Sequence, residues 1–146
     1  MRAYLTSIGE TSEQVCKNQL NKLGFEVILM NDKEDWPTKY KKFIDLADDD
    51  CLRIDADVIL FNDFKIPKIM PKICMAQWQV VDFRKFALHV GQPIYYSKKL
   101  LDIVKTLPVS IHRPETSMWR RPEIINHTLT IKEVAGLHRS PMINYG

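Results

Sequence analysis

Two aspartates, Asp55 and Asp57, interrupt an apolar run that covers residues 51–61. A carboxylate is costly to bury unless it is paired or bound to a metal, so two of them in such a run need an explanation. In an extended chain the side chains of residues i and i+2 point to the same side, which would present both carboxylates together at the end of a buried strand. Hard oxygen ligands suit Mg²⁺ or Mn²⁺, and these ions also bind phosphate oxygens. The pattern therefore predicts a cation that holds a nucleoside diphosphate, although one aspartate in a turn and one in solvent would give the same tripeptide.

The residues before the two aspartates extend this pattern. Residues 39–47, the acidic residues 48–50 and residues 51–57 are similar to the helix, acidic turn and strand that deliver the Asp-x-Asp motif in the GT-A glycosyltransferases. The resemblance implies a Rossmann-like α/β sandwich, with a mostly parallel central sheet flanked by helices, and Mn²⁺ or Mg²⁺ as cofactor. It also implies that Asp57 binds the metal directly, while Asp55 contacts the ribose, the metal or a metal-bound water.

Polar residues follow the first two predicted strands, and ligands of open α/β sheets lie beyond the carboxyl ends of strands. The resemblance places the base and ribose of a uridine or guanosine nucleotide, with uridine favoured, at Thr6, Ser7 and Glu10, where the first strand ends, and at Asp32 after the second. Each of these residue types is also a common turn former. Lys39, off the apolar face of its predicted helix, either reaches the diphosphate or is solvated.

The stretch covering residues 112–121 resembles the start of the helix on which inverting GT-A enzymes carry their catalytic base. The family has a Glu-Asp pair there, whereas this chain has Glu115 followed by Thr116, so Glu115 is the base candidate and the second carboxylate is missing. The alternative is that Glu115 lies in the first turn of a helix beginning near Pro114, where the helix dipole favours an acidic residue.

Residues 129–135 alternate like a strand, and Gly136 is expected to turn the chain. In several GT-A enzymes a late histidine completes the metal site, and the resemblance assigns that role to His138. Residues 139–146 are expected to close over the bound metal and diphosphate, with Arg139 donating to a phosphate oxygen. The alternative is a surface turn with a solvated histidine and a frayed terminus.

The elements that position these residues are predicted from local signals. Residues 3–8 and 25–30 are apolar runs, and between them the capping-box spacing of Thr11 and Gln14 begins a helix that Gly24 ends. This β-α-β unit should place two parallel strands in one sheet with a right-handed crossover. Pro37 can open the next helix, and Ser97 is suited to be the N-cap of a later one.

The composition fits one domain over residues 1–146, because 45% hydrophobic content suffices for a single core. The net charge of +3 is too mild and too dispersed along the chain to indicate nucleic-acid binding. Three cysteines, Cys16, Cys51 and Cys74, lack a C-x-x-C spacing and are expected to be buried thiols of a cytoplasmic protein. We expect neither a signal peptide nor a membrane span, since no apolar stretch approaches about 20 residues.

The leading hypothesis is a metal-dependent glycosyltransferase that moves a sugar from a nucleoside-diphosphate sugar, with a UDP-sugar favoured, to a hydroxyl of a carbohydrate or other acceptor. A nucleotidyltransferase is the nearest rival, although it would normally have a glycine-rich basic loop after the first strand. Residues 8–12 contain one glycine and no basic residue. The third hypothesis is a non-catalytic nucleotide-sugar-binding or structural module of the same fold.

Overall fold

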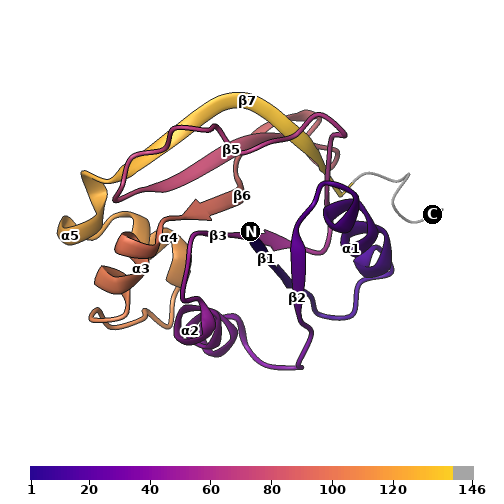
Figure 1. The fold of residues 1–146 in the computed structure, drawn as a ribbon. Coiled ribbons are helices and arrows are strands. Elements are labelled where there is room, and N and C mark those ends of the chain that lie inside the picture. Colours follow the sequence, from indigo (N-terminus) through magenta and orange to yellow (C-terminus); the bar gives the residue numbers. More distant parts are fainter. Residues whose placement is uncertain (140–146) are drawn as a thin grey trace.

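A seven-stranded mixed sheet forms the centre of the computed structural model, which describes residues 1–139 (Figure 1). The strand order is β2-β1-β3-β6-β5-β7-β4. The strands are β1 (Arg2–Thr6), β2 (Glu26–Met30), β3 (Cys51–Asp55), β4 (Val58–Leu60), β5 (Met75–Asp82), β6 (Ala87–Tyr96) and β7 (Thr128–His138). Strand β1 runs parallel to β2 and β3, and β5 runs parallel to β7, whereas β3–β6, β5–β6 and β4–β7 are antiparallel.

The expectation of a mostly parallel sheet therefore needs correction. It holds for β2, β1 and β3. Beyond β3 the chain uses a hairpin, because only residues 83–86 separate β5 from β6 and a short loop can join antiparallel strands but not parallel ones. The fold class is α/β with a mixed sheet.

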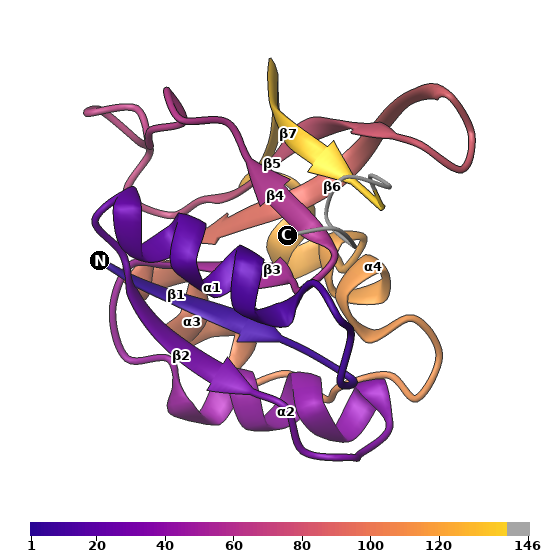
Figure 2. The ribbon, with the colours of Figure 1, turned by 90° about the vertical axis from the view of Figure 1, so that its right-hand side faces the viewer.

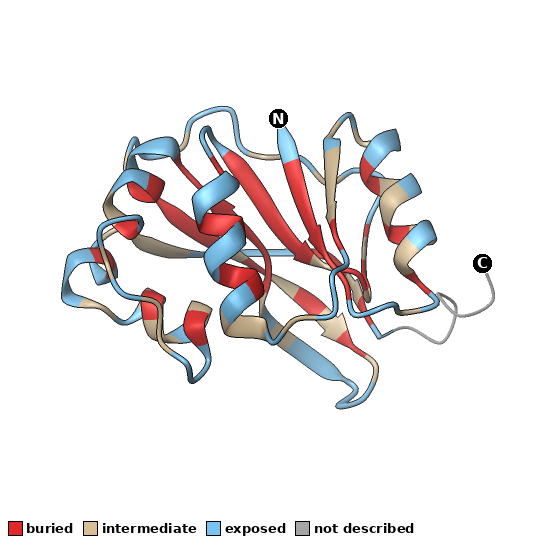
Figure 3. Cartoon of the chain, turned by 90° about the horizontal axis from the view of Figure 1, so that it is seen from below, coloured by how far each residue is buried: buried red, intermediate tan, exposed pale blue. Residues whose placement is uncertain are grey.

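Helices cover both faces of the sheet (Figures 1 and 2). Alternate residues of β1 point to opposite faces, so that Leu5 packs in the cluster with α1 and Tyr4 packs in the cluster with α2. Figure 3 shows that the buried positions concentrate on the central strands and on the helix surfaces facing them. The helices are α1 (Glu13–Lys22) on one face, and α2 (Trp36–Leu46), α3 (Lys98–Val104), α4 (Pro114–Trp119) and α5 (Pro122–Ile125) on the other.

Three helix ends agree with the local sequence signals. The unit β1-α1-β2 has the predicted parallel pairing, and Gly24 follows α1 with a φ of +91° that suits glycine. Helix α1 begins later than the capping-box spacing predicts, with Ser12 at its N-cap. Pro37 lies in the first turn of α2, and Ser97 caps α3 by accepting a hydrogen bond from the Leu100 backbone N–H.

Two expectations about the chain path are wrong. Strand β3 ends at Asp55, and Ala56 and Asp57 form a turn into β4, so Asp57 does not continue the strand. Strand β7 runs through Gly136 without turning. A Cβ atom at position 136 would lie 2.1 Å from the backbone oxygen of Ile59, so glycine is needed there because β4 approaches closely.

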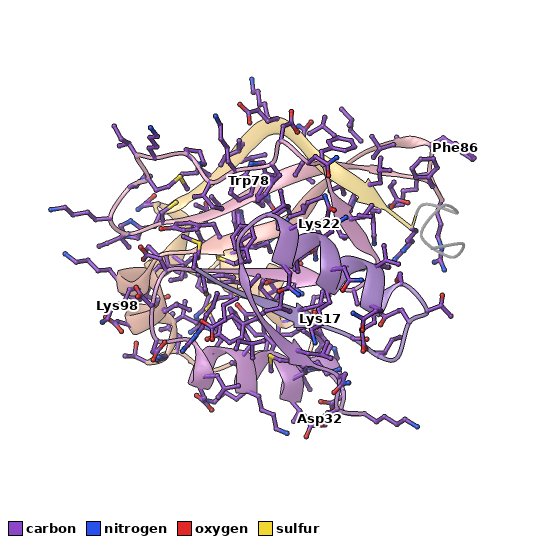
Figure 4. The ribbon with its side chains drawn as sticks, turned by 45° about the vertical axis from the view of Figure 1, so that its right-hand side comes forward. Lys17, Lys22, Asp32, Trp78, Phe86 and Lys98 are labelled. Carbon is purple, nitrogen blue, oxygen red and sulfur yellow. The ribbon has the colours of Figure 1, made fainter. Side chains whose placement is uncertain are left out.

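The loop between β5 and β6 projects from the body of the molecule (Figure 2). Its last residue, Phe86, is 87% exposed and lies at the periphery in Figure 4. Among residues 1–139, no helix is both long enough and apolar enough to cross a bilayer.

Candidate functional site

A cleft of about 760 Å³ opens where β1 and β3 end, between α2, α4 and the middle of β6. Its position agrees with the rule that ligands of open α/β sheets bind beyond the carboxyl ends of parallel strands. Eight of the residues singled out from the sequence line it: Thr6, Ser7, Glu10, Lys39, Asp55, Glu115, His138 and Arg139. Asp32 and Asp57 are not among its lining residues.

A buried arginine, Arg53, organises one side of the cleft, and we call its surroundings the Arg53 centre (Thr6, Arg53, Asp55, Tyr96 and Glu115). The Arg53 guanidinium binds Glu115 through two nitrogens, at 2.7 and 2.6 Å, and binds Asp55 Oδ1 at 2.6 Å. Burial alone would lower the pKa of Arg53, but the charges of Glu115 and Asp55 outweigh it and hold that pKa well above the ordinary value. Arg53 is therefore a fixed cation at the floor of the cleft.

Both carboxylate oxygens of Glu115 are engaged by protein donors. One accepts from Arg53 Nη2, and the other accepts from Arg53 Nε and from the Tyr96 hydroxyl, which in turn lies 3.2 Å from the Tyr40 hydroxyl. An acceptor hydroxyl would have to compete with three donors to reach these oxygens. The geometry favours Glu115 as an anchor for Arg53 over the predicted role of catalytic base.

Asp55 is held as completely. Its Oδ1 accepts from Arg53 and from the Thr6 hydroxyl at 2.9 Å, and its Oδ2 accepts from the Gln92 amide at 3.0 Å. Gln92 also accepts from the Asp55 backbone N–H, so β6 fixes both ends of this residue. A guanidinium at 2.6 Å competes with any cation for Asp55, which favours the alternative that Asp55 contacts the ribose or a water.

Asp57 and His138 lie side by side at the end of the cleft. His138 Nε2 is 3.2 Å from Asp57 Oδ2, and Arg139 Nε is 3.5 Å from the same oxygen. Burial would raise the pKa of Asp57, but the hydrogen bond and charge of His138, together with Arg139, outweigh it, so this pKa lies below the ordinary value. Two buried atoms of the pair, Asp57 Oδ1 and His138 Nδ1, have no hydrogen-bond partner, although Asp82 lies 3.6 Å from the latter. The structure therefore places side by side two of the residues that the family resemblance assigned to a metal, and the shared cation stays a prediction.

Backbone contacts fix the turn that carries Asp57. The carbonyl oxygen of Ala56 accepts from the Ser12 hydroxyl at 2.6 Å and from the Cys16 thiol at 2.8 Å. The Arg139 backbone N–H donates to the Asp57 carbonyl at 2.9 Å, which ties the end of β7 to the same turn. Backbone contacts thus place the turn and the end of β7, while the side chains of Asp57 and His138 bond to each other.

The pair fits a divalent cation better than Asp55 does. Within residues 1–139, no group of three or more histidine, cysteine, aspartate or glutamate side chains is arranged to hold a metal ion. Magnesium, however, often takes only one or two protein ligands and completes its shell with substrate phosphates and water. Octahedral ligands at about 2.1 Å from the ion are about 3 Å apart, close to the 3.2 Å between Asp57 Oδ2 and His138 Nε2.

Three predicted nucleotide contacts have other surroundings than expected. Lys39 is buried, and its ammonium donates to the Ser7 carbonyl at 2.6 Å, so the expectation that it lies off the core face is wrong. The Ser7 hydroxyl lies 2.6 Å from both the Glu10 and Glu13 carboxylates. Asp32 lies at the edge of the molecule, where Lys42 is 3.9 Å away, because the loop after β2 carries it to the surface (Figure 4). Glu34 lines the cleft instead of Asp32.

Sequence reasoning also missed other cleft residues, among them Arg53, Gln92, Arg113 and Arg120. Arg53 carried a signal, because a charged residue inside the apolar run is as costly to bury as Asp55. Its partners were not visible, since Glu115 and Gln92 are distant in the chain.

No protein-family model and no curated protein matches the sequence. Solved structures do match the fold. The A197 protein from STIV superposes with a TM-score of 0.69 at 11% identity, over 94% of this chain and 85% of that one. A 4-diphosphocytidyl-2C-methyl-D-erythritol synthase from Anaerococcus prevotii gives 0.51 at 8% identity, over 99% and 95%. A CMP:2-keto-3-deoxy-manno-octonic acid synthetase complexed with CTP gives 0.46 at 12% identity, over 93% and 91%.

These matches show the fold. The chain has the α/β fold, with a mixed seven-stranded sheet, that is shared by GT-A and nucleotidyltransferase-like proteins. At such identities the fold does not choose between the two reactions.

Proposed function

We propose that this protein is a glycosyltransferase that binds a nucleoside-diphosphate sugar, with UDP favoured as the nucleotide, and passes the sugar to a hydroxyl of a carbohydrate or other acceptor. The observation that carries the proposal is the pairing of Asp57 with His138, 81 positions apart in the chain, beside a cleft at the strand ends. The match to the A197 protein from STIV supports the fold on which this site is built and does not by itself indicate a reaction.

In this proposal each residue at the cleft has a separate role. Asp57 and His138 would hold Mn²⁺ or Mg²⁺, which when bound neutralises charge on the departing nucleoside diphosphate. Arg139, beside the pair, donates to a phosphate oxygen. Thr6 and Asp55, at the ends of β1 and β3, contact the ribose. Glu115 serves as a base only if donor binding frees it from Arg53.

Calorimetry of UDP binding with and without Mn²⁺ tests this proposal. We expect Mn²⁺ to lower the Kd of the wild-type protein for UDP. Asp57→Asn and His138→Ala should each weaken Mn²⁺-dependent UDP binding at least about tenfold, because each deletes one of two protein ligands. Asp63→Asn, an exposed aspartate outside the cleft, is the matched control and should bind like the wild type. An Asp57→Asn protein that still responds fully to Mn²⁺ would show that the cation binds elsewhere.

A nucleotidyltransferase is the second candidate, and the position of Lys39 favours it. The loop after β1 lacks a basic residue of its own, yet the Lys39 ammonium lies 2.6 Å from the Ser7 carbonyl in that loop and lines the cleft. The product separates the two reactions. A glycosyltransferase releases a nucleoside diphosphate from a nucleotide-sugar, whereas a nucleotidyltransferase releases pyrophosphate from a nucleoside triphosphate. Nucleotide binding without either product would support the non-catalytic module.

A further inference from the structure

A second hollow of about 400 Å³ opens beside α4, and we call it the side groove. Three of its residues, Arg113, Thr116 and Arg120, also line the main cleft, so the two hollows share a wall. The groove is lined by Ile111, His112, Arg113, Thr116, Ser117 and Arg120. A single bound molecule could therefore extend from the cleft into the groove.

The side groove carries positive charge that nothing in the described structure neutralises. Its lining includes two arginines and a histidine but no carboxylate. Within residues 1–139, neither Arg113 nor Arg120 has a carboxylate within ion-pair distance, whereas the neighbouring Arg121 lies 3.7 Å from Glu123. Glu115, two residues from Arg113, is engaged by Arg53, and Glu123, three residues from Arg120, lies near Arg121. Exposed guanidinium groups left in this way are suited to bind an anion.

The backbone at Arg113 is also unusual. Its φ of +44° lies in the left-handed region, which side-chain-bearing residues rarely adopt and which costs about 1 kcal/mol or more. Glycine or asparagine would fit this position with less strain. An arginine kept here is consistent with a need for its side chain at the junction of the two hollows.

We propose that the side groove binds an anionic group, a phosphate or a carboxylate, on the acceptor molecule. The inference rests on the proposed function, because it assigns the donor diphosphate to Asp57, His138 and Arg139 and leaves Arg113 and Arg120 for the second substrate. Arginine forks recognise both phosphate and carboxylate groups through paired hydrogen bonds. The acceptor hydroxyl then lies in the main cleft while the anionic group lies beside α4.

The test titrates glucose 6-phosphate, glucuronate and glucose into protein saturated with UDP and Mn²⁺. We expect at least one of the two anions to bind and glucose to bind no more than weakly, and the preferred anion identifies the chemical class of the acceptor. Arg113→Gln and Arg120→Gln should each weaken anion binding about tenfold, because each removes charge-assisted hydrogen bonds. Arg84→Gln, which removes the same charge from an exposed residue outside both hollows, should have no effect.

Two results would overturn the inference. An anion that binds the free protein but not the UDP-saturated protein would show that the arginines belong to the donor site. Anion binding that is absent from the wild type, or unchanged in the arginine variants, would show that the groove is not an anion site. Asp57→Asn separates this inference from the proposed function. That variant should lose Mn²⁺-dependent UDP binding and, titrated without UDP, keep the affinity for the preferred anion that the wild type shows under the same conditions.

Discussion

Every carboxylate oxygen in the Arg53 centre accepts a hydrogen bond from a protein donor, whereas the Asp57–His138 pair keeps one carboxylate oxygen and one imidazole nitrogen buried without a hydrogen-bond partner. Both lie at the same end of the sheet. A buried polar atom without a partner is costly, so native structures seldom keep one without a reason. The difference indicates that the Arg53 centre holds the cleft in shape, whereas the pair has hydrogen-bonding capacity that its mutual hydrogen bond and Arg139 do not use.

The two regions are also positioned by different means. Side-chain hydrogen bonds and ion pairs hold the Arg53 centre together. The pair is placed mainly through its backbone, by bonds to the Ala56 carbonyl and by the pairing of β4 with β7, in which Val58 lies opposite His138. Because the backbone sets their positions, the contact between Asp57 Oδ2 and His138 Nε2 can be exchanged for contacts with a ligand without moving either residue.

The largest effect is expected from breaking the Arg53 centre. Arg53→Met removes the partner of Glu115, whose side chain is only 12% exposed, and leaves its charge uncompensated. We expect the free energy of unfolding to fall by about 3–5 kcal/mol, measured by urea denaturation. The double variant Arg53→Met with Glu115→Met should recover much of this loss, because it removes both charges.

Arg2→Met is the matched control, since Arg2 pairs with Glu26 and Asp48 on the surface. Exposed pairs contribute about 1 kcal/mol or less, so this variant should remain close to the wild type. If Arg53→Met were no more destabilising than Arg2→Met, the Arg53 centre would not have the structural role assigned to it.

A smaller effect is expected from pushing apart the strands that carry the pair. Gly136→Ala places a Cβ atom 2.1 Å from the Ile59 oxygen and 2.8 Å from Leu60 Cα, so β4 and β7 must separate. We expect a loss of about 1–3 kcal/mol of stability together with weaker Mn²⁺-dependent UDP binding. Ala135→Gly, at the adjacent buried position, should lower stability without displacing β4 and should keep the Mn²⁺ response. Equal Mn²⁺ responses in the two variants would contradict backbone placement of the pair.

Local sequence signals predicted several helix ends and the parallel β1-α1-β2 unit, but not the strand pairing beyond β3. Gly24, Pro37 and Ser97 act within a few residues of themselves, so the helix ends that they mark can be read from short windows. Strand pairing beyond β3 depends on contacts between distant segments, such as β7 lying between β5 and β4. No spacing in the sequence encodes that order, which is why the sheet was expected to be mostly parallel.

The candidate site, too, could be predicted from the sequence only in part. The residue types at Asp55, Glu115 and His138 pointed to one cleft through a family resemblance, and the structure brings all three to its lining. The sequence did not indicate that Arg53 would engage two of them, because side-chain pairing follows from the packing of α4 against β3. Asp32 was predicted to contact the nucleotide but does not line the cleft, since an acidic residue after a strand does not reveal where its loop leads.

The smallest effect concerns Cys16, whose thiol donates to the Ala56 carbonyl between the two regions compared above. Burial, followed by the nearby charges of Asp57 and Glu10, raises the pKa of Cys16 to about 12, whereas an unfolded thiol ionises near 8.5. Because the folded pKa is the higher one, this contribution to stability is fully present below about pH 8.5 and is lost as the pH rises toward 12. The variant Cys16→Ser keeps a donor for the Ala56 carbonyl but does not ionise in this range. Between pH 7.5 and 9.5 its free energy of unfolding, measured by urea denaturation, should fall by about 1.4 kcal/mol less than that of the wild type. Cys74→Ser, which removes another buried thiol but does not touch the turn, should flatten the pH dependence without altering the Mn²⁺ response. If the free energy of unfolding of Cys16→Ser fell with pH as steeply as that of the wild type, the Cys16 thiol would be open to solvent and would not hold the turn that carries Asp57.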